Sequence, residues 1–422
     1  MALTNGRFPA VAKRDSGPDA APGSPQRLSD PMTQSQMPPA APSGRDLRLD
    51  LFRGLALWLI YLDHIPSNMV SWVTIRNYGF SDATEIFVFI SGYTAAFVYG
   101  REMGNRGFIV ASARVLKRTW QLYVAHIFLF VIYMAEIAYV AASFENPLYS
   151  EEMGIINFLK QPDVTMIQAM LLKFKPANMD VLPLYIILLA GLPPMLWLLL
   201  RNATLALAVS VTVYGLTWWF DVNFPAYPSG TWVFNPLAWQ LLFVFGAWCA
   251  LGGAERIGPL ARSRPVFWIA VAYLAFAFAI TLTWYFPRMA VYVPKWFSEW
   301  MYPIDKTNLD VLRFAHFLAL AIVTLRYVPR DWSALTSPAM RPAILCGQHS
   351  LEIFCLGVFL SFLGHFAMVE ISDGLAMQVL ISVLGIVAMV ATAALISWYK
   401  NIEGRKAPRQ ATPNADLAGG EA

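Results

Sequence analysis

Charged residues are scarce in this sequence of 422 residues. They make up 14% of it, against about a quarter in an ordinary soluble domain, whereas hydrophobic residues make up 57%. This imbalance excludes an ordinary soluble globular protein and predicts a chain that crosses a lipid bilayer. The formal net charge is only +4, so the composition gives no reason to expect a nucleic-acid partner.

Cysteine and the common nucleotide-binding motifs are also nearly absent. The three cysteines, Cys249, Cys346 and Cys355, lie in or beside apolar segments without metal-ligand spacing. We therefore expect packing roles for them, with neither a disulfide nor a metal site. There is no P-loop, no glycine-rich dinucleotide fingerprint and no Gly-x-Ser-x-Gly elbow. Because no stretch remains for a soluble catalytic domain, any chemistry is expected among the helices, without a bound cofactor.

Long apolar stretches divide the sequence into three parts. Residues 1–44 are rich in Pro, Ala, Ser, Gly and Gln, which predicts a disordered cytoplasmic tail without a secretory signal. Residues 45–400 are predicted to form one all-α domain, a polytopic membrane helix bundle with about ten transmembrane helices, and 401–422 a second disordered tail. Each predicted span approaches the roughly 20 residues that cross about 30 Å of hydrocarbon. The spans are 47–65, 84–100, 118–141, 181–200, 203–220, 236–252, 266–286, 309–328, 343–367 and 375–398.

Basic residues gather on one side of these predicted spans. The turn between the second and third spans holds five of them, whereas the connections 221–235 and 370–374 on the opposite side hold none. The positive-inside rule then places both termini in the cytoplasm, Arg53 toward the cytoplasmic leaflet and His64 toward the outer face.

The outer connections carry a long mixed segment and many aromatic residues. Residues 142–180 are mixed in charge, and the part near 151–160 predicts an amphipathic helix at the membrane surface. The aromatic residues fit either the ordinary interfacial belt or a platform on which sugars stack. They are Trp218, Trp219, Tyr227, Trp232, Trp284, Tyr285, Trp296, Trp300 and Tyr302.

The stretch from Arg48 to Pro66 combines an apolar helical pattern with ionisable groups. Arg53 and His64 are eleven positions apart, close to three helical turns, so both side chains share one face roughly 16 Å apart along the axis. Ionisable groups in a membrane helix are expensive, which makes them candidates for function. The alternative is an arginine that reaches the membrane surface and a histidine packed between helices. Pro66 disfavours helix at Ile65, so we expect a helix break next to His64.

Three stretches resemble motifs of the membrane-bound acyltransferase superfamily. Leu49 to His64 is similar to its first-helix motif, an Arg and a His separated by ten residues. Phe87 to Tyr93 resembles its Phe-rich Ser-Gly motif, which includes Ser91. Gly347 to Phe354 resembles its late motif, although Leu351 stands where the superfamily usually has Tyr.

Other stretches point to one branch of that superfamily. The sequences around Arg45-Asp46, Met179-Asp180-Val-Leu-Pro and Asp305-Lys306-Thr-Asn308-Leu-Asp310 resemble the OpgC family, which succinylates osmoregulated periplasmic glucans. The resemblance covers residues from about Arg45 to Tyr399. It implies an acyltransferase of the bacterial inner membrane whose partners are acyl-CoA and a periplasmic glucan. The acyl-CoA would be a co-substrate and not a resident cofactor.

The donor expected from the resemblance is succinyl-CoA on the cytoplasmic side, and the acceptor is a glucan hydroxyl on the outer side. Two alternatives remain open. One is an O-acetyltransferase that acts on lipopolysaccharide or an exopolysaccharide. The other is a transporter or flippase, in which the ionisable groups would form a substrate pathway.

His64 is the expected general base for acyl transfer, since its imidazole titrates near neutrality. A base needs an orienting partner. Asp63 is adjacent, but neighbouring helical side chains diverge by about 100°. Glu85 at the start of the second span is the preferred partner, and its alternative role is a carboxylate at a helix N-terminus. The remaining histidines, His126, His316, His349 and His365, are expected mostly to be satisfied packing residues. His316 and His349 are the two that could also touch the site, and His349 is assigned to the acyl-binding group.

The expected acyl-CoA site lies at the cytoplasmic end. Arg53 would hold a phosphate or the pantetheine amides, and a planar guanidinium suits phosphate. Arg114 and Arg118 share a helix face, with Lys117 beside them. The alternative for these three is the ordinary basic charge of the inner leaflet.

The expected acyl-binding group lies near the start of the eighth span. Lys306, Asp310 and Arg313 recur at spacings of four and three, which would place them on one helix face. Arg313 lies in an apolar run and needs an anion, either Asp310 or the carboxylate of a succinyl group. Glu352 is expected to form a structural ion pair.

Overall fold

The computed structural model describes residues 46–406, and its regular structure in that range is entirely helical. The predicted tail 1–44 and residues 407–422 lie outside the described residues, whereas α17 continues past the predicted domain end to Lys406. The α-helices are α1 (Leu47–Asp63), α2 (Ala83–Ser143), α3 (Leu148–Glu152), α4 (Ile156–Lys160), α5 (Pro162–Met170), α6 (Val181–Ala190), α7 (Leu192–Arg201), α8 (Ala203–Phe220), α9 (Pro236–Trp248), α10 (Ala254–Ala261), α11 (Arg264–Tyr285), α12 (Pro287–Ala290), α13 (Lys295–Met301), α14 (Val311–Tyr327), α15 (Arg341–Gln348), α16 (Ser350–Glu370) and α17 (Leu375–Lys406).

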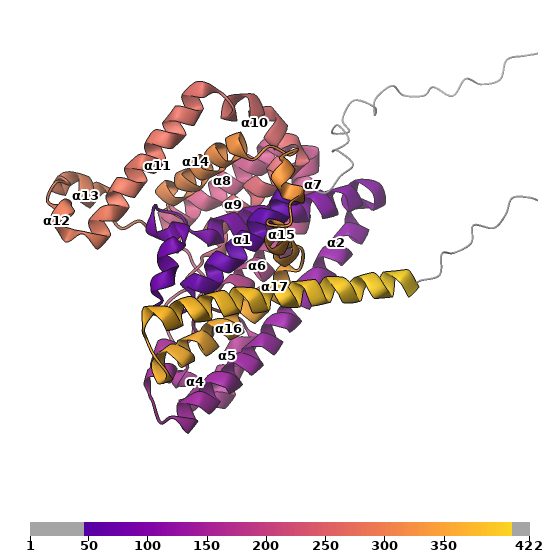
Figure 1. Cartoon of the computed structure of the whole chain (residues 1–422). Coiled ribbons are helices and arrows are strands. Elements are labelled where there is room, and N and C mark those ends of the chain that lie inside the picture. The colour runs from indigo at the N-terminus through magenta and orange to yellow at the C-terminus, as the bar shows by residue number, and fades with distance from the viewer. Residues whose placement is uncertain (1–45, 407–422) are drawn as a thin grey trace, which may run out of the picture. The chain divides into compact units, whose positions relative to one another are not determined.

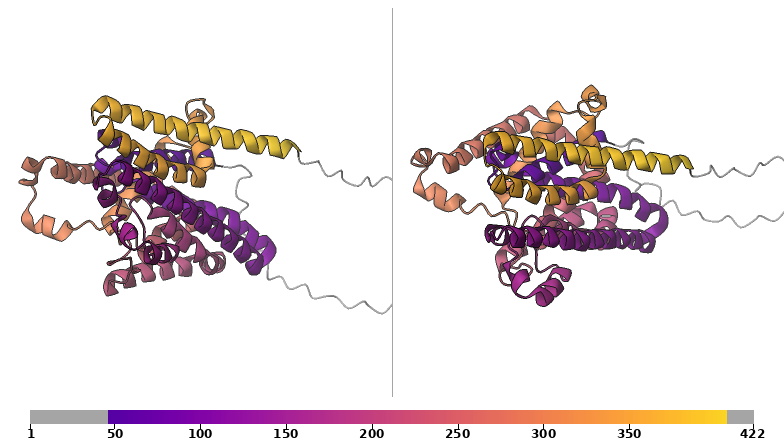
Figure 2. Two further views of the ribbon diagram at one scale, coloured as in Figure 1. Left: turned by 90° about the horizontal axis from the view of Figure 1, so that it is seen from below. Right: turned by 60° about the horizontal axis from the view of Figure 1, so that its bottom comes forward.

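Every predicted span contains helix, but one helix does not correspond to one span. Helix α2 covers the second and third spans and is interrupted at Gly107, whose φ of 81° lies outside the helical region. Its two halves run in different directions on either side of this glycine (Figures 1 and 2). The fourth span consists of α6 and α7, which bend by 52°. The ninth is broken at His349, between α15 and α16.

The structure agrees with the predicted helical class but contains fewer candidate membrane spans than the ten predicted. Within residues 46–406, six helices are long and apolar enough to cross a membrane, or seven if α6 and α7 form one bent span. Helices α1 and α14 have 17 residues each, just under the 18 required, and α2 counts once although it covers two predicted spans. The all-α class with several membrane helices is therefore confirmed, whereas the count of ten stays a prediction.

Glycines set the closest helix contacts. A Cβ on Gly54 of α1 would lie 1.8 Å from the carbonyl oxygen of Ala343, and one on Gly347 would lie 1.9 Å from that of Asp50. A Cβ on Gly92 of α2 would lie 2.0 Å from the carbonyl oxygen of Phe243 in α9. Small residues allow backbones to approach in membrane bundles. These contacts fix α1 against α15 and α2 against α9, the helices that position the site.

The connection from 144 to 180 packs along α2 and does not lie only beyond its end. The Tyr133 hydroxyl contacts Met153 Sδ at 3.2 Å, and the Tyr123 hydroxyl donates to the carbonyl of Met170 at 2.9 Å. Tyr123 and Tyr133 are ten residues apart, about 15 Å along a helix. The part near 151–160, predicted as one surface helix, is instead divided between the end of α3 and α4, and α5 follows it.

Candidate active site

Helix α1 ends at Asp63 and places His64 at its C-terminal cap. The backbone N–H of His64 donates to the carbonyls of Ile60 and Tyr61, at 3.0 and 3.2 Å. The expected break before Pro66 is confirmed, because Pro66 disfavours helical geometry in the residue that precedes it. The carbonyl of His64 accepts a hydrogen bond from Asn178 Nδ2 at 3.1 Å.

The imidazole of His64 lacks the orienting partner that we expected. Its Nδ1 is buried and has no hydrogen-bond partner among residues 46–406. Asp63 instead accepts from the Thr74 hydroxyl at 2.8 Å and lies 3.8 Å from Arg76. The expected hydrogen bond between Glu85 and His64 is not formed, because Glu85 is engaged elsewhere.

Glu85 belongs to a network of two acids and two bases at the start of α2. Arg313 Nε donates to Glu85 Oε1 at 2.9 Å, and its Nη2 lies 2.6 Å from the same oxygen and 3.2 Å from Asp82 Oδ2. Lys306 Nζ lies 2.6 Å from Asp82 Oδ2. Glu85 is 0% exposed and Arg313 8% exposed, so little water screens these contacts.

The same two acids begin α2 as a capping box. The Asp82 carboxylate accepts from the backbone N–H of Thr84 at 2.8 Å, and Glu85 Oε2 accepts from the N–H of Asp82 at 2.9 Å. Although burial raises the pKa of the Asp82 carboxyl, the charges of Lys306 and Arg313 together hold it well below its usual range. Asp82 is therefore an anion in contact with both Lys306 and Arg313, and Glu85 is a second carboxyl group on Arg313.

The expected pairing of Arg313 with Asp310 is wrong. Helix α14 begins at Val311, so Lys306 and Asp310 precede it and do not share a helix face with Arg313. Asp310 is the N-cap, and its carboxylate accepts from the N–H of Leu312 at 2.8 Å. Local spacing suggested Asp310, but the partners of Arg313 lie 228 and 231 residues away along the chain.

Hydrogen bonds in the turn before α14 hold the backbone of Lys306 in place. Asp305 Oδ1 accepts from the N–H of Thr307 at 2.7 Å, and its Oδ2 accepts from Asn308 Nδ2 at 2.8 Å. The indole N–H of Trp239 donates to the carbonyl of Lys306 at 3.1 Å. With its backbone held in this way, Lys306 extends its ammonium to Asp82.

A loop before α6 brings further polar groups beside His64. Besides Asn178, this loop carries Lys175, whose ammonium lies 4.0 Å from the centre of the Trp232 ring. Burial lowers the pKa of Lys175 to about 8 and raises that of Asp180 to about 6, and the opposite charge of each partly offsets this. Trp232 is 3% exposed and covered by Lys175, so it is not an open platform for a sugar.

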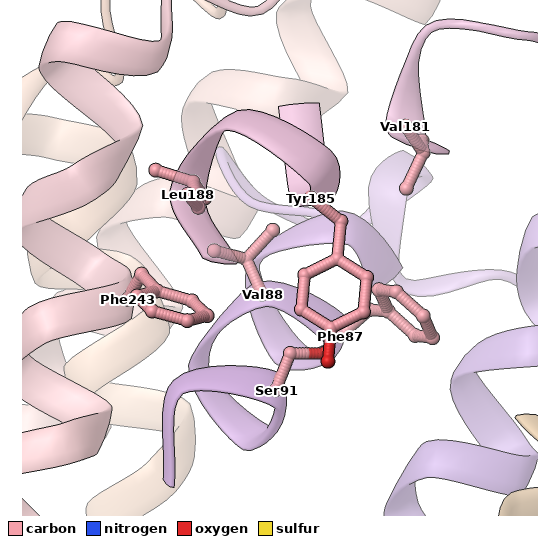
Figure 3. A pocket seen from close by; sticks show the side chains of 7 residues that line it. All are labelled: Phe87, Val88, Ser91, Val181, Tyr185, Leu188 and Phe243. Carbon is pink, nitrogen blue, oxygen red and sulfur yellow. The ribbon is translucent and has the colours of Figure 1, made fainter. Parts of the chain in front are cut away.

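Arg53 contacts α2 next to Ser91, which lines a small gap between helices. Its Nη2 donates to the Thr94 hydroxyl at 2.6 Å and to the carbonyl of Ile90 at 3.2 Å. Ser91 and Tyr185 line the gap (Figure 3), and Tyr185 is within electrostatic range of Arg53 and Arg118. The gap has no room for a water molecule; its lining residues are Phe87, Val88, Ser91, Val181, Tyr185, Leu188 and Phe243.

Comparison with known protein families identifies the family of this chain. The family model described as OpgC protein matches residues 45–401. The chain belongs to the OpgC family. No curated protein and no solved structure matches it.

As an OpgC family member, the chain is an OpgC-type membrane acyltransferase in general terms. The residues that carried the resemblance have identifiable structural positions. Gly54 and Gly347 meet between α1 and α15, Gly92 meets α9, and Lys306 and Asp310 hold the start of α2 and α14. Packing and capping therefore explain some of the residues on which the resemblance was based.

The basic residues predicted to form the acyl-CoA site of this OpgC chain are only partly brought together. Arg114 lies 2.8 Å from Glu102, so one of its partners is an acid on the same helix. Arg118 donates to Gln121 at 3.3 Å, and Lys117 is exposed. Of these three, Arg118 is the one that shares Tyr185 with Arg53.

His349 lies against α17, away from the histidine at the end of α1. Its Nε2 lies 2.7 Å from the Ser397 hydroxyl and its Nδ1 lies 3.3 Å from Lys400 Nζ. It follows Gly347 by two residues and so lies near the Arg53 part of α1. Glu352 lies 3.9 Å from Lys400, but both side chains are exposed, so the expected structural ion pair is only a surface contact.

The other three histidines do not share one role. His316 Nδ1 lies 2.7 Å from the Ser81 hydroxyl, and His365 Nε2 lies 2.8 Å from Glu152, so both are paired. His126 is 1% exposed, and neither of its ring nitrogens has a hydrogen-bond partner among residues 46–406. His126 is therefore an exception to the expectation that most of these histidines are satisfied packing residues.

Proposed function

We propose that this chain transfers an acyl group, succinyl in our assignment, from cytoplasmic acyl-CoA to a hydroxyl of a periplasmic glucan. Membership of the OpgC family supports acyl transfer, and the distribution of basic residues supports an inner-membrane protein with both termini in the cytoplasm. In this arrangement α1 and α14 are short crossings and each half of α2 crosses once, which gives ten crossings.

The observation that carries the proposal is the buried, unpartnered Nδ1 of His64 at a helix end. A buried imidazole without an acid partner favours the neutral form, which is the form that accepts a proton. The helix break beside it frees the chain to line a cavity. His64 is thus suited to receive the proton of an incoming hydroxyl.

The reaction then proceeds without a bound cofactor. The glucan hydroxyl attacks the thioester carbonyl as His64 takes its proton, a new C–O bond forms, and the C–S bond breaks. The proton on His64 returns to the departing thiolate of CoA. The ion pairs among Asp82, Glu85, Lys306 and Arg313 hold the start of α2 against the turn before α14. Asp63 holds the loop after α1 by accepting a hydrogen bond from Thr74.

The donor approaches from the Arg53 part of α1. Arg53 and Arg118, both within electrostatic range of Tyr185, suit the anionic end of acyl-CoA, and the exposed Lys117 is next to Arg118 in the sequence. The thioester would reach His64 past Ser91, roughly 16 Å along α1. Since the gap at Ser91 is closed to water, the helices that line it have to separate when the donor binds.

The test is transfer by the purified full-length protein. It should consume succinyl-CoA in the presence of periplasmic glucan and release free CoA. His64→Ala should reduce the rate by about 10²–10⁴-fold, as expected for loss of a general base. His365→Gln removes a different buried histidine and should retain activity within a few-fold. Near-full activity of His64→Ala at normal abundance would refute His64 as the base.

A further inference from the structure

Three cations near His64 already have carboxylates. Lys306 contacts Asp82, Arg313 contacts Asp82 and Glu85, and Arg76 lies 3.8 Å from Asp63. We expected Lys306 and Arg313 to hold the distal carboxylate of a succinyl group. Because both cations already contact carboxyl groups, a further anion gains little there.

Lys175 differs from these cations. It has no carboxylate within 4.0 Å among residues 46–406, and Asp180 acts on it only at longer range. Its ammonium donates to the carbonyl of Leu172 at 3.3 Å and lies over the face of Trp232. An ammonium has three N–H donors, so its capacity for hydrogen bonds exceeds these contacts. Its lowered pKa of about 8 reflects the cost of holding this charge out of water.

His126 supplies a second polar group with unused capacity. It is buried at 1% exposure, both ring nitrogens are unpartnered in the described part of the chain, and it is within electrostatic range of Lys175. Burying a polar group without a partner is costly. A ligand atom that accepts from the imidazole N–H would remove that cost.

Both residues are connected to the His64 region. Lys175 lies three residues before Asn178, which donates to the carbonyl of His64. His126 lies seven residues, about two helical turns, before Tyr133, and Tyr133 interacts with Asn178. A cation and an unpartnered buried imidazole therefore lie within electrostatic range of each other, on two segments linked to the proposed base through Asn178.

We propose that Lys175 and His126 form a carboxylate-binding subsite that receives the distal carboxylate of a dicarboxylic acyl group. The proposal rests on the proposed function and deepens it by naming the residues that select the acyl class. Lys175 supplies the opposite charge and His126 a hydrogen bond. A monocarboxylic acyl group, such as butyryl, has no second carboxylate and gains nothing from the subsite.

The decisive experiment compares succinyl-CoA with butyryl-CoA as donors for the full-length protein in lipid nanodiscs. Lys175→Met should lower the ratio of succinyl to butyryl transfer by about 10- to 100-fold, the range expected for a hydrogen bond to a charged group. Lys175→Arg should keep most of the preference. His126→Phe should lower the ratio in the same direction. Lys173→Met, in the same loop, is the matched control and should leave the ratio unchanged.

A binding measurement separates this proposal from the reaction. Succinate should protect Lys175 from an amine-modifying reagent in the unmutated protein, as read by mass spectrometry, whereas succinamide, which has no carboxylate, should not. Equal loss with both donors in Lys175→Met, or no protection by succinate, would overturn the subsite. Absence of transfer from either donor in the unmutated protein would instead refute the proposed function, and protection by succinate would still support the subsite.

Discussion

Arg313→Met is expected to destabilise the folded protein strongly, because Arg313 neutralises carboxylates from another helix. The substitution keeps an apolar side chain of similar length but removes the guanidinium. Lys306 remains on Asp82, whereas Glu85 loses its ion-pair partner at a position with 0% exposure. The contact also joins α14 to the start of α2, so its loss affects how these helices are held.

The size of the effect follows from burial. Removing one partner of a buried ion pair typically costs about 3–5 kcal/mol, because the other charge remains out of water. The double variant Glu85→Gln with Arg313→Met removes both charges, and glutamine can still accept from the N–H of Asp82 in the capping box. We therefore expect the double variant to lose at least about 1 kcal/mol less than the sum of the single variants.

The assay is equilibrium unfolding of the purified protein in one detergent, with the two single variants and the double variant forming a cycle. Asp310→Asn is the control, since asparagine caps a helix about as well as aspartate, and it should change stability little. An Arg313→Met protein as stable as the unmutated one would refute the reasoning. So would equal losses in Arg313→Met and Asp310→Asn, which would return Asp310 to the role of ionic partner.

Two further predictions follow from packing and charge. Gly54→Ala should destabilise the protein by roughly 1–3 kcal/mol and reduce transfer, because the new Cβ would overlap the carbonyl of Ala343. Gly215→Ala is the control in the same unfolding assay. It has open space at its Cβ and should be neutral or slightly stabilising. The preference for succinyl over butyryl should fall as pH rises through about 8, where Lys175 loses its proton and its positive charge. Lys175→Arg should keep the preference across the same pH series. An unchanged preference in the unmutated protein up to pH 10 would contradict the role of the ammonium.

Sequence reasoning succeeded where the cause is local. Apolar runs predicted the helical segments, and Pro66 predicted the break after α1, since each depends on a few consecutive residues. The two predicted spans 84–100 and 118–141 correspond to the two halves of α2. The sequence did not predict that helix would continue from each span up to a break at Gly107, because a positive φ there depends on how the two halves pack. The broken ninth span at His349 has the same kind of origin.

The partners of the charged residues could not be read from spacing. The i, i+3 rule joined Asp310 to Arg313 on the assumption of a continuous helix, but an aspartate directly before an apolar run is also an N-cap signal. That second signal is the one the structure follows. Arg313 then pairs with acids from α2, a contact between elements that no local pattern specifies.

Lys175 and His126 were missed for a related reason. A side chain is unpartnered because of what surrounds it in three dimensions, and the sequence around His126 is an ordinary apolar helix. One signal was present: Lys175 lies in a connection that the positive-inside rule assigns to the base-poor side, where a lysine is not explained by membrane orientation. A cation on that side is paired, solvated or used for binding. The structure pairs Lys306 and Arg313 with acids and leaves Lys175 half-buried on Trp232, so Lys175 is the cation for which binding is the remaining explanation.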